Sequence, residues 1–396
     1  MKIVLINSCN YGSTGNIMHH IAACARARGH AAYTCVPKTR SNQKNADEHT
    51  IFIGGKISKN IHALLGYYTG LNGCFSRWAT RRFLKKLNEI KPDVIHLHNL
   101  HNCYINLPML FRYIKAHSIR TIWTLHDCWA FTGQCPHFTL VECSKWADGC
   151  SNCPQYTAYP AARLDRTKKM YRLKREWFTG VEDMTVVTPS VWLGELVKRS
   201  FLKDYTIQVI NNGIDLSVFR PTPSNFREKY HCEDKHLILG VSFGWGFKKG
   251  LDVFVELSKK LPEKYQIVLV GTDENTEREL PAGVIAIRRT ANQKQLAEIY
   301  TACDLFVNPT REENYPTVNM EAIACGTPVL TFKTGGSPEI VDVDTGMVTE
   351  QNTAQAMELA ILSYFSEEPI LAQRCANAAV KFDMKSKFQA YTDLYE

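Results

Sequence analysis

The sequence predicts an α/β protein made of two facing Rossmann-like domains with a ligand cleft between them. Short apolar runs rich in β-branched residues alternate with helical patterns along most of the chain, as in parallel sheets covered by helices. A length of 396 residues suits two domains better than one core. Each half also has a glycine-bearing turn at a strand end, where such sheets bind ligands.

The first half, residues 1–204, alternates strands and helices. The predicted strands are Lys2–Ser8, Ala32–Val36, Thr50–Ile53, Asp93–His98, Thr121–His126 and Thr185–Pro189. The predicted helices are Ile17–Arg28, most of Ser58–Lys91, the basic surface segment Arg163–Trp177 and a Ser190-capped helix to about Phe201. A turn that contains Gly12 and Gly15 joins the first strand to the first helix.

An insertion at residues 127–159 interrupts this alternation and holds five Cys. Loops of this length are uncommon in compact domains without a function or a cross-link. Cys150 and Cys153 form a CxxC, and Cys135 and Cys143 complete a set of four thiolates that would suit a structural zinc. Buried reduced thiols explain the same residues equally well. A redox role is less favoured, because this CxxC does not open a helix after a strand.

The two halves differ in charge. Residues 1–204 hold 28 Lys and Arg against 13 Asp and Glu, whereas residues 205–396 hold 19 against 26, so the first half carries +15 and the second −7. A basic half predicts an anionic partner, either nucleic acid or an anionic membrane. Aromatic residues interleaved with Arg and Lys in Ser58–Lys91 suit a membrane interface, and a solvated basic helix face explains them equally well.

The termini and the apolar runs also bound the location. No apolar run is long enough to span a bilayer, and the start of the chain leads into a strand rather than a signal peptide. We therefore expect a cytoplasmic protein whose 14 Cys are free thiols or metal ligands rather than a disulfide framework.

Histidines follow two strands of the first half. His98 and His101 come at and after the end of Asp93–His98, and His126 ends the strand Thr121–His126. Because open α/β sheets bind ligands at the carboxyl ends of their strands, these side chains are candidates for a substrate site.

The second half, residues 205–382, continues the same alternation. Its predicted strands are Thr206–Ile210, Leu237–Ser242, Gln266–Val270, Val284–Ile287 and Leu305–Asn308. Its predicted helices begin at Gly250, at Gln293 (to Cys303) and inside Glu313–Val329, and a last helix covers about Lys385–Tyr395.

The stretch Glu313–Val329 carries the clearest chemistry. Pro316 opens a short helix and Gly326 closes it, so the first N–H groups, at Thr317 and Val318, form an anion site suited to phosphate. Glu313 precedes this helix, and Glu321 lies one turn after Thr317 on the same face. Carboxylates repel phosphate but accept hydrogen bonds from hydroxyls, so the combination predicts a nucleotide sugar as ligand.

Two Glu separated by seven residues, with an aromatic-Pro pair after the first and EAxAxGxPV at the second, resemble the signature of family-4 retaining glycosyltransferases. NNGID at 211–215, Lys249-Gly250 and GGSPE at 335–339 extend the likeness along nearly the whole chain. The resemblance implies the GT-B fold, with residues 383–396 returning to the first domain. It also implies metal-independent, retaining transfer from a nucleotide diphosphate sugar to an acceptor hydroxyl.

The branch of the family that the sequence resembles assembles bacterial surface polysaccharides, such as exopolysaccharide, capsule or the O-antigen of lipopolysaccharide. The resemblance therefore implies a lipid-linked saccharide acceptor and a peripheral position at the inner face of the plasma membrane.

The resemblance also assigns roles. Glu313 contacts the donor sugar, Glu321 the ribose and His126 the donor hexose. Lys249 holds the diphosphate, helped by Lys248, because the Arg that the family usually carries a few residues earlier is missing. The other expected substrate-binding residues are Gly12, Ser13, Thr14, Gly15, His98, His101, Arg289, Thr290, Asn314, Tyr315, Pro316, Thr317 and Val318.

Two other functions remain open from the sequence. A sugar-nucleotide epimerase of the same fold would hydrolyse or isomerise the donor without an acceptor. A basic nucleic-acid-binding protein would explain the charge of the first half, but no recognisable binding motif accompanies that charge. A dehydrogenase is disfavoured because neither glycine-bearing turn has the dinucleotide spacing.

Overall fold

The computed structural model describes residues 1–396 and divides them into two compact units. Unit 1 comprises Met1–Ile210 and Phe388–Glu396, and unit 2 comprises Asn211–Lys387. The border falls after Ile210 rather than after residue 204, because the strand at 206–209 pairs with the sheet of unit 1. Each unit has its own parallel sheet and its own core.

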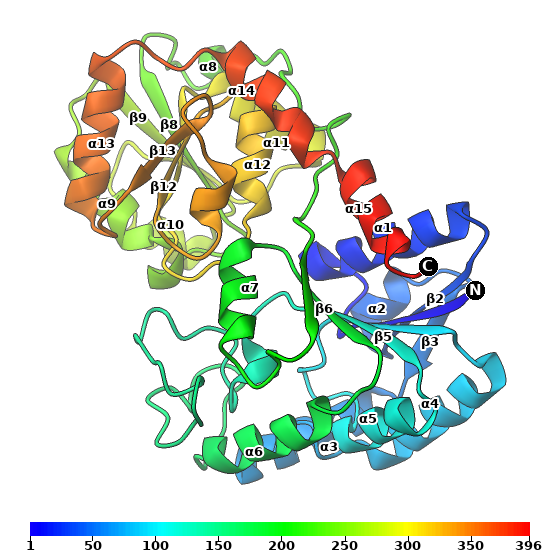
Figure 1. Cartoon of the computed structure of the whole chain (residues 1–396). Helices are drawn as coiled ribbons and strands as arrows, with labels where there is room; N and C mark the ends of the chain where they lie inside the picture. Colours follow the sequence, from blue (N-terminus) through cyan, green and yellow to red (C-terminus); the bar gives the residue numbers. More distant parts are fainter. The chain divides into compact units, whose positions relative to one another are not determined.

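Unit 1 is a seven-stranded parallel sheet with helices on its faces (Figure 1). Its strands are β1 (Lys2–Ile6), β2 (Ala31–Pro37), β3 (Thr50–Ile53), β4 (Val94–Leu97), β5 (Arg120–Thr124), β6 (Met184–Thr188) and β7 (Thr206–Val209). Its helices are α1 (Gly12–Ala27), α2 (Arg40–Lys44), α3 (Lys56–Thr69), α4 (Arg77–Ile90), α5 (Leu107–Ala116), η1 (Trp129–Phe131), α6 (Thr167–Phe178) and α7 (Val191–Lys198).

The strand order of unit 1 is β3-β2-β1-β4-β5-β6-β7. β1 pairs with β2 on one side, with Ile3 opposite Ala32, and with β4 on the other, with Ile3 opposite Val94. The order therefore reverses between β1 and β4, and the carboxyl ends of these strands flank the switch point at which such sheets bind ligands.

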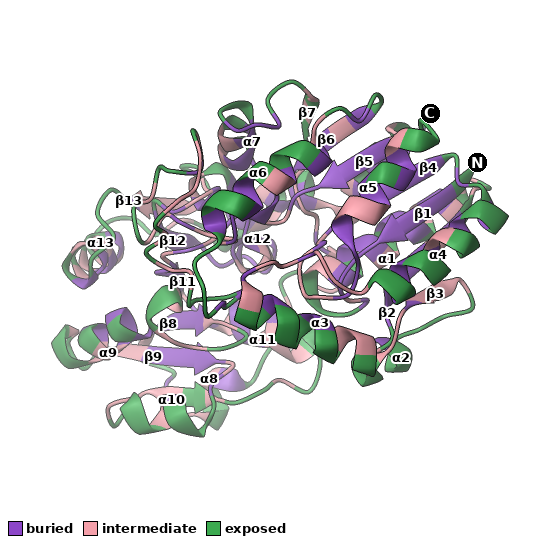
Figure 2. Ribbon diagram, turned by 90° about the horizontal axis from the view of Figure 1, so that it is seen from below, coloured by how far each residue is buried: buried purple, intermediate pink, exposed green.

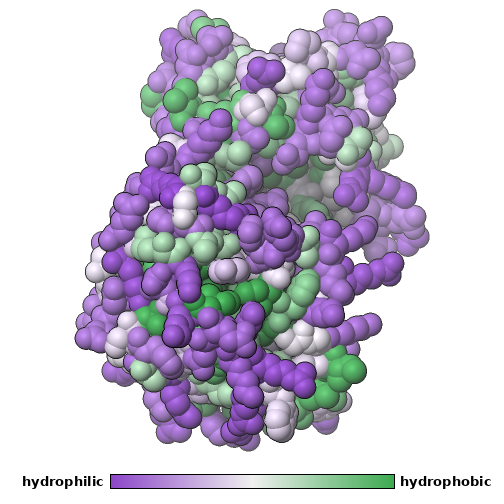
Figure 3. All heavy atoms as spheres, turned by 90° about the vertical axis from the view of Figure 1, so that its right-hand side faces the viewer, coloured by the Kyte–Doolittle hydropathy of each residue, from purple (hydrophilic) through white to green (hydrophobic).

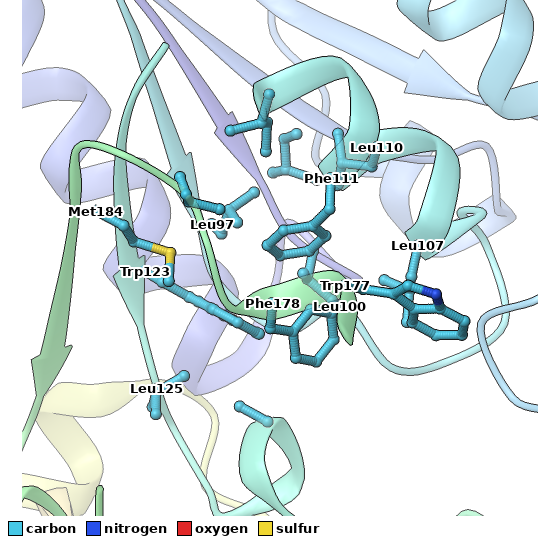
Figure 4. Packing of buried hydrophobic residues seen from close by; sticks show 14 of the residues in the cluster. Leu97, Leu100, Leu107, Leu110, Phe111, Trp123, Leu125, Trp177, Phe178 and Met184 are labelled. Carbon is cyan, nitrogen blue, oxygen red and sulfur yellow. The ribbon is translucent and has the colours of Figure 1, made fainter. Parts of the chain in front are cut away.

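Aromatic side chains fill the core between the sheet of unit 1 and the helices α5 and α6 (Figure 4). Phe111 of α5 and Trp123 of β5 both pack on Phe178 at the end of α6, with ring centroids 4.6 and 4.8 Å from it. All three are buried, and rings of this size contribute most of the apolar area that holds a helix on a sheet.

Unit 2 is a six-stranded parallel sheet in the order β10-β9-β8-β11-β12-β13. Its strands are β8 (His236–Val241), β9 (Tyr265–Val270), β10 (Ile285–Ile287), β11 (Leu305–Asn308), β12 (Val329–Phe332) and β13 (Gly346–Thr349). Its helices are α8 (Phe226–Lys229), η2 (Phe247–Lys249), α9 (Leu251–Lys260), α10 (Glu274–Glu279), α11 (Gln293–Ala302), α12 (Thr317–Ala324), η3 (Ser337–Ile340), α13 (Ala354–Ser366), α14 (Ala372–Ala378) and η4 (Ala379–Phe382). The switch point of this sheet lies between β8 and β11.

The last helix, α15 (Met384–Asp393), begins in unit 2 and ends in unit 1. Phe388 stacks on His20 of α1 with ring centroids 5.2 Å apart, and Figure 1 shows α15 beside α1. Tyr391 and Tyr395 are buried in unit 1. None of the helices in the structure is long and apolar enough to cross a membrane.

The segment 58–91 is mostly helical, as predicted, and forms two helices, α3 and α4, that are separated at Gly70–Ser76. One detail of the sequence-based prediction was wrong. The basic helix α6 is not simply a surface helix, because Lys174 in its middle is completely buried. Its ammonium group lies 3.6 Å from the ring centre of Trp129 and donates hydrogen bonds to the carbonyls of Trp129 and Thr132.

Candidate active site

In unit 2, the loops that follow β8 and β11 carry the predicted phosphate and sugar contacts. Lys248 and Lys249 lie in η2 after β8, and Glu313 lies in the loop after β11. β8 and β11 are neighbours on either side of the switch point. The sheet thus brings these residues together although about 64 positions separate Lys249 from Glu313 in sequence.

Two Lys–Glu pairs join these loops. The ammonium of Lys249 donates to Oε2 of Glu313 at 2.6 Å, and Lys248 pairs with Glu312. Glu312 is nearly fully buried, and its Oε1 has no hydrogen-bond partner. The sequence did not single out Glu312, since an acidic residue beside Glu313 carries no signal of its own. The pairs hold both cations near the switch point of the sheet, against the loop that leads into α12.

The loop after β11 is fixed by contacts to η2 and α9. Arg311 donates to both carboxylate oxygens of Asp252, at 2.8 Å each, and to the carbonyl of Phe247 at 2.7 Å. Bidentate Arg–carboxylate contacts of this kind fix geometry as well as adding energy. Arg311 is therefore committed to the scaffold and does not stand in for the missing phosphate-binding Arg.

The GGSPE turn supports the backbone of the central stretch. A side chain on Gly335 would meet the carbonyl oxygen of Glu313 at 2.0 Å, and Gly335 has a φ of +56°. Gly336 donates its N–H to the carbonyl of Asn314 at 2.7 Å. Tyr315 is buried, and its carbonyl accepts from Asn212 at 3.2 Å. Glycine is thus required at position 335 because two backbone segments touch here.

The N-terminus of α12 has the predicted form. Pro316 is the N-cap residue, and no side chain caps the first turn, which begins at Thr317 and Val318. Unpaired N–H groups and the helix dipole make this end a site for an anion. The helix ends at Ala324, and Gly326 follows with a φ of +86°.

Glu321 lies one turn into α12. Its carboxylate accepts hydrogen bonds from Thr317 and from the hydroxyl of Tyr300, the latter at 3.3 Å. Burial raises the pKa of Glu321 to about 7, and the two hydrogen bonds partly offset that rise. Tyr300 is completely buried on α11, where a lone tyrosine in a helical pattern gave no sign that it reaches Glu321.

The structure does not bring every predicted donor contact to the switch point. Arg289 and Thr290 follow β10, the edge strand, which β9 and β8 separate from β11. Their neighbour Arg288 is held by Glu277 of α10 at 2.8 Å. Contact of Arg289 and Thr290 with the base stays a prediction.

In unit 1, three histidines stack where β4 and β5 end. The ring centroids of His96 and His98 are 4.4 Å apart, and those of His98 and His126 are 5.4 Å apart. Nδ1 of His98 shares a hydrogen bond of 3.1 Å with Nε2 of His126, and Nε2 of His98 is buried without a partner. Burial lowers the pKa of His126 to about 4 and that of His96 to about 3, so the stack is neutral at pH 7.

His101 belongs to a second group. Its Nε2 lies 3.1 Å from Asp127 and its Nδ1 lies 3.0 Å from the hydroxyl of Tyr159. Asp127 and Tyr159 are the first and last residues of the Cys-rich insertion, so His101 connects both ends of that loop. These contacts indicate that His101 holds the two ends of the insertion together. Contact of His101 with a substrate stays a prediction.

We had expected a glycine-bearing turn between β1 and a helix that begins at Ile17. In the structure these glycines are already helical, because α1 begins at Gly12. Gly12, Ser13, Thr14 and Gly15 form the first turn of α1, and a side chain on Gly15 would meet the backbone of Asn10 at 2.6 Å. Asn7, at the end of β1, donates to the carbonyl of Thr14 at 3.1 Å and accepts from the N–H of Asn99 at 3.3 Å. Asn7 thus links both sides of the switch point, which its place in an apolar strand did not predict.

The four predicted zinc ligands line one small pocket in the insertion. Cys135, Cys143, Cys150 and Cys153 face the same space, and the N–H of Gly133 donates to Sγ of Cys150 at 3.1 Å. Burial raises the pKa of Cys150 to about 11. No group of three or more His, Cys, Asp or Glu side chains is arranged so that it could hold a metal ion. The thiols do not fit a zinc site as they stand, and zinc binding stays a prediction.

Two parallel α/β sheets, each with polar groups at its switch point, are the architecture of the GT-B fold. Residues 14–218 match the family model "Glycosyltransferase Family 4", and residues 225–382 match "Glycosyl transferases group 1". The chain belongs to glycosyltransferase family 4.

Curated relatives agree with this assignment. The "putative colanic acid biosynthesis glycosyl transferase WcaC" of Escherichia coli K12 is 26% identical over 279 residues, which cover 68% of this chain and 67% of that protein. The "N,N'-diacetylbacillosaminyl-diphospho-undecaprenol alpha-1,3-N-acetylgalactosaminyltransferase" of Campylobacter jejuni is 27% identical over 218 residues, covering 51% of this chain and 57% of that protein.

Solved structures share the fold over the whole chain. A sucrose-phosphate synthase from Thermosynechococcus elongatus has a TM-score of 0.70 at 18% identity, covering 100% of this chain and 98% of that chain. Anabaena Alr3699/HepE in complex with UDP has a TM-score of 0.70 at 15% identity, covering 100% and 99%. At these identities the likeness concerns the fold.

Proposed function

We propose that this protein transfers a sugar from a nucleotide diphosphate sugar to a hydroxyl of a saccharide acceptor, retaining the anomeric configuration and using no metal in the chemical step. The observation that carries the proposal is the Lys249–Glu313 pair in the same stretch as the uncapped N-terminus of α12. A cation and a helix N-terminus suit a diphosphate, and Glu313 and Glu321 suit the hydroxyls on either side of it.

When the donor binds, it replaces the contact between Lys249 and Glu313 with contacts to the donor itself. Lys249 turns from Glu313 to the diphosphate, and together with the N–H groups of Thr317 and Val318 it stabilises the negative charge that develops on the leaving group. Glu313, released from Lys249, then faces the transferred sugar, whose ring becomes positively charged as the bond to phosphate breaks. The acceptor hydroxyl attacks from the face that the diphosphate leaves, and a phosphate oxygen takes its proton.

The acceptor we propose is a lipid-linked saccharide in the assembly of a surface polysaccharide, used at the inner face of the plasma membrane. Support comes from the E. coli and C. jejuni relatives, whose names refer to colanic acid biosynthesis and to a diphospho-undecaprenol acceptor. The net charge of +15 on residues 1–204 favours an anionic membrane as the surface on which this acceptor is met.

A donor screen tests the proposal. Candidate nucleotide sugars are first ranked by thermal stabilisation, because a ligand at a hundred times its dissociation constant stabilises by about 2.7 kcal/mol. The donors that stabilise are then incubated with lipid-linked saccharide acceptors, and the product linkage is read by NMR. An α-linked product from an α-linked donor, formed in the presence of EDTA, is expected. Conversion of the donor at the same rate without an acceptor would instead indicate the epimerase alternative.

A further inference from the structure

Helix α3 has its apolar side chains on the wrong face for a helix that packs on a sheet. Its exposed large apolar residues are Ile57, Ile61, Leu64, Leu65, Tyr67 and Tyr68. All of these except Tyr67 follow the i, i+4, i+7, i+8, i+11 spacing of a single helical stripe, which in a globular helix normally faces the core. Figure 2 shows α3 coloured mainly as exposed, and Figure 3 shows a mostly hydrophilic face on which apolar groups appear only in patches.

The inward face of α3 is polar or small and is firmly held. His62 is buried between Ser76, at 2.9 Å from its Nδ1, and the N–H of Gly73, which donates to its Nε2 at 3.1 Å. A side chain on Gly66 would meet the amide of Asn72 at 2.6 Å. The helix therefore cannot roll to bury its apolar stripe without breaking these contacts, and the stripe faces solvent because of the packing.

Cations are numerous on α3 and α4. The exposed residues of α4 include Arg77, Arg81, Arg82, Lys85 and Lys86, and α3 adds Lys56 and Lys59 without any acidic residue. The only acidic residue of α4, Glu89, pairs with Lys86 at 2.9 Å. Trp78 is 76% exposed at the start of α4, with the guanidinium of Arg81 5.3 Å from its ring centre.

The start of α3 and the outer face of α4 share one groove. Its volume is about 590 Å³, and its lining includes Gly55 and Ser58 from the α3 side and Trp78, Arg82 and Lys86 from α4. The groove thus connects the N-terminal end of α3, where the stripe begins at Ile57, with the exposed tryptophan and the cations of α4. We call the surface formed by residues 56–68 of α3 and 77–86 of α4 the α3–α4 face.

We propose that the α3–α4 face is the surface by which the protein docks on an anionic lipid bilayer. The apolar stripe and Trp78 enter the boundary between headgroups and acyl chains, and the cations of α4 contact lipid phosphates. The excess of cations selects this occupant over a second copy of the chain, because two such faces would repel one another across a symmetric interface. The purpose of the docking rests on the proposed lipid-linked acceptor, but the binding itself does not.

Vesicle flotation of the full-length protein tests the apolar part. Ile57→Glu combined with Leu64→Glu is expected to weaken binding to phosphatidylglycerol-containing vesicles more than about tenfold, since two apolar side chains no longer enter the bilayer. The matched control is Leu359→Glu with Val343→Glu, which places the same charges at exposed apolar positions of unit 2. Circular dichroism and the melting temperature report whether each variant is folded.

The basic part is tested by Arg82→Gln with Lys85→Gln, against Lys264→Gln with Lys294→Gln in unit 2. Each cation near an anionic leaflet strengthens binding roughly fivefold, so the α4 variant, which loses two, should bind about twenty-five-fold more weakly at low salt, and the control should match the wild type. Brominated lipids should quench the fluorescence of Trp78, and Trp78→Phe should remove most of this quenching, because four of the other six tryptophans are buried.

Three results would overturn the proposal: equal binding to phosphatidylglycerol and pure phosphatidylcholine vesicles, unchanged binding of the α3 variant, or a dimer of the wild type that this variant dissociates. Sugar transfer to a water-soluble acceptor analogue separates the proposal from the proposed function. If the α3 variant still transfers sugar to the soluble analogue but no longer binds vesicles, both the docking surface and the proposed function are supported. If the wild type binds vesicles but transfers nothing, only the proposed function fails.

Discussion

The two sheets of this protein have the same kind of switch point, but they equip it with opposite chemistry. Unit 1 presents a stack of the buried His96 and His98 and the partly buried His126, and this stack is neutral at pH 7. Unit 2 presents charged pairs, with Lys249 bound to Glu313. A neutral imidazole can donate one hydrogen bond to a hydroxyl and accept one from it. An ammonium and a carboxylate, in contrast, interact strongly with charged groups of a ligand. The same sheet topology therefore places side chains at equivalent positions in both units. The residues that follow each strand determine which part of a substrate each sheet suits.

The largest effect should come from unfolding the Cys-rich insertion, which would lower the stability of unit 1 alone. If Cys135, Cys143, Cys150 and Cys153 close around zinc, elemental analysis of protein purified without added metal should find about one equivalent. Chelation should then lower the melting temperature by at least about 5 °C and disturb the contacts of His101 at the two ends of the loop, while binding of the nucleotide sugar donor stays intact. Metal-free protein with an unchanged melting temperature would favour buried thiols.

In unit 2, Glu313→Gln should lower kcat by about ten- to a hundredfold. A charge-assisted hydrogen bond is worth about 1.5–3 kcal/mol, and a carboxylate beside a sugar ring matters most when that ring becomes positively charged. Steady-state kinetics with varied donor measure this change. Glu350→Gln is the matched control, because Glu350 is an exposed carboxylate of unit 2 that pairs with Lys333 at 2.8 Å. An unchanged kcat would remove Glu313 from the reacting part of the donor.

Glu321→Gln should raise the donor KM by about tenfold and leave kcat almost unchanged, because the ribose does not change during the reaction. Hydroxyl donors favour the ionised carboxylate, so the donor should lower the raised pKa of Glu321 and bind more weakly as the pH falls below about 7. Calorimetry at two pH values measures this dependence, which the variant should lose. A fall in kcat with KM unchanged would reverse the roles of the two glutamates.

The smallest effect should be the pH response of the histidine stack. The pKa values of His96 and His126 are depressed below the usual 6.5, so the folded state binds fewer protons than the unfolded chain between pH 6.5 and about 4. The free energy of unfolding should therefore be greatest above pH 6.5 and decrease as the pH falls towards 4. Denaturant titrations across this range measure it, and His126→Asn should flatten the curve. A maximum below pH 6 would mean that the stack is charged.

Local patterns predicted much of this fold and part of the site. Apolar runs and helical spacing located the strands, and Pro316 and Gly326 located a short helix because caps are local chemistry. Spacing also placed Glu321 beside Thr317, one turn away on the same face. These features need only neighbours in sequence, which is why they can be read without a structure.

Contacts between distant residues could not be predicted in this way. Tyr300 meets Glu321 across two helices, and Glu312 pairs with Lys248 from a separate loop. The buried Lys174 looked like any other cation of a basic helix, since its partners are backbone carbonyls of the insertion. Each of these depends on how whole elements pack, and no periodicity within one segment contains that information.

The hydrogen bond between His96 and Tyr395 has a consequence for folding during synthesis. Nδ1 of His96 lies 2.7 Å from the hydroxyl of Tyr395, across 299 positions of the chain. A ribosome synthesises residues 388–396 only after all of unit 2 has been translated, so unit 1 leaves the tunnel with an incomplete core beside β4. The first unit to be translated is therefore the last to reach its final packing, and His96 lacks its hydrogen-bond partner Tyr395 during that interval.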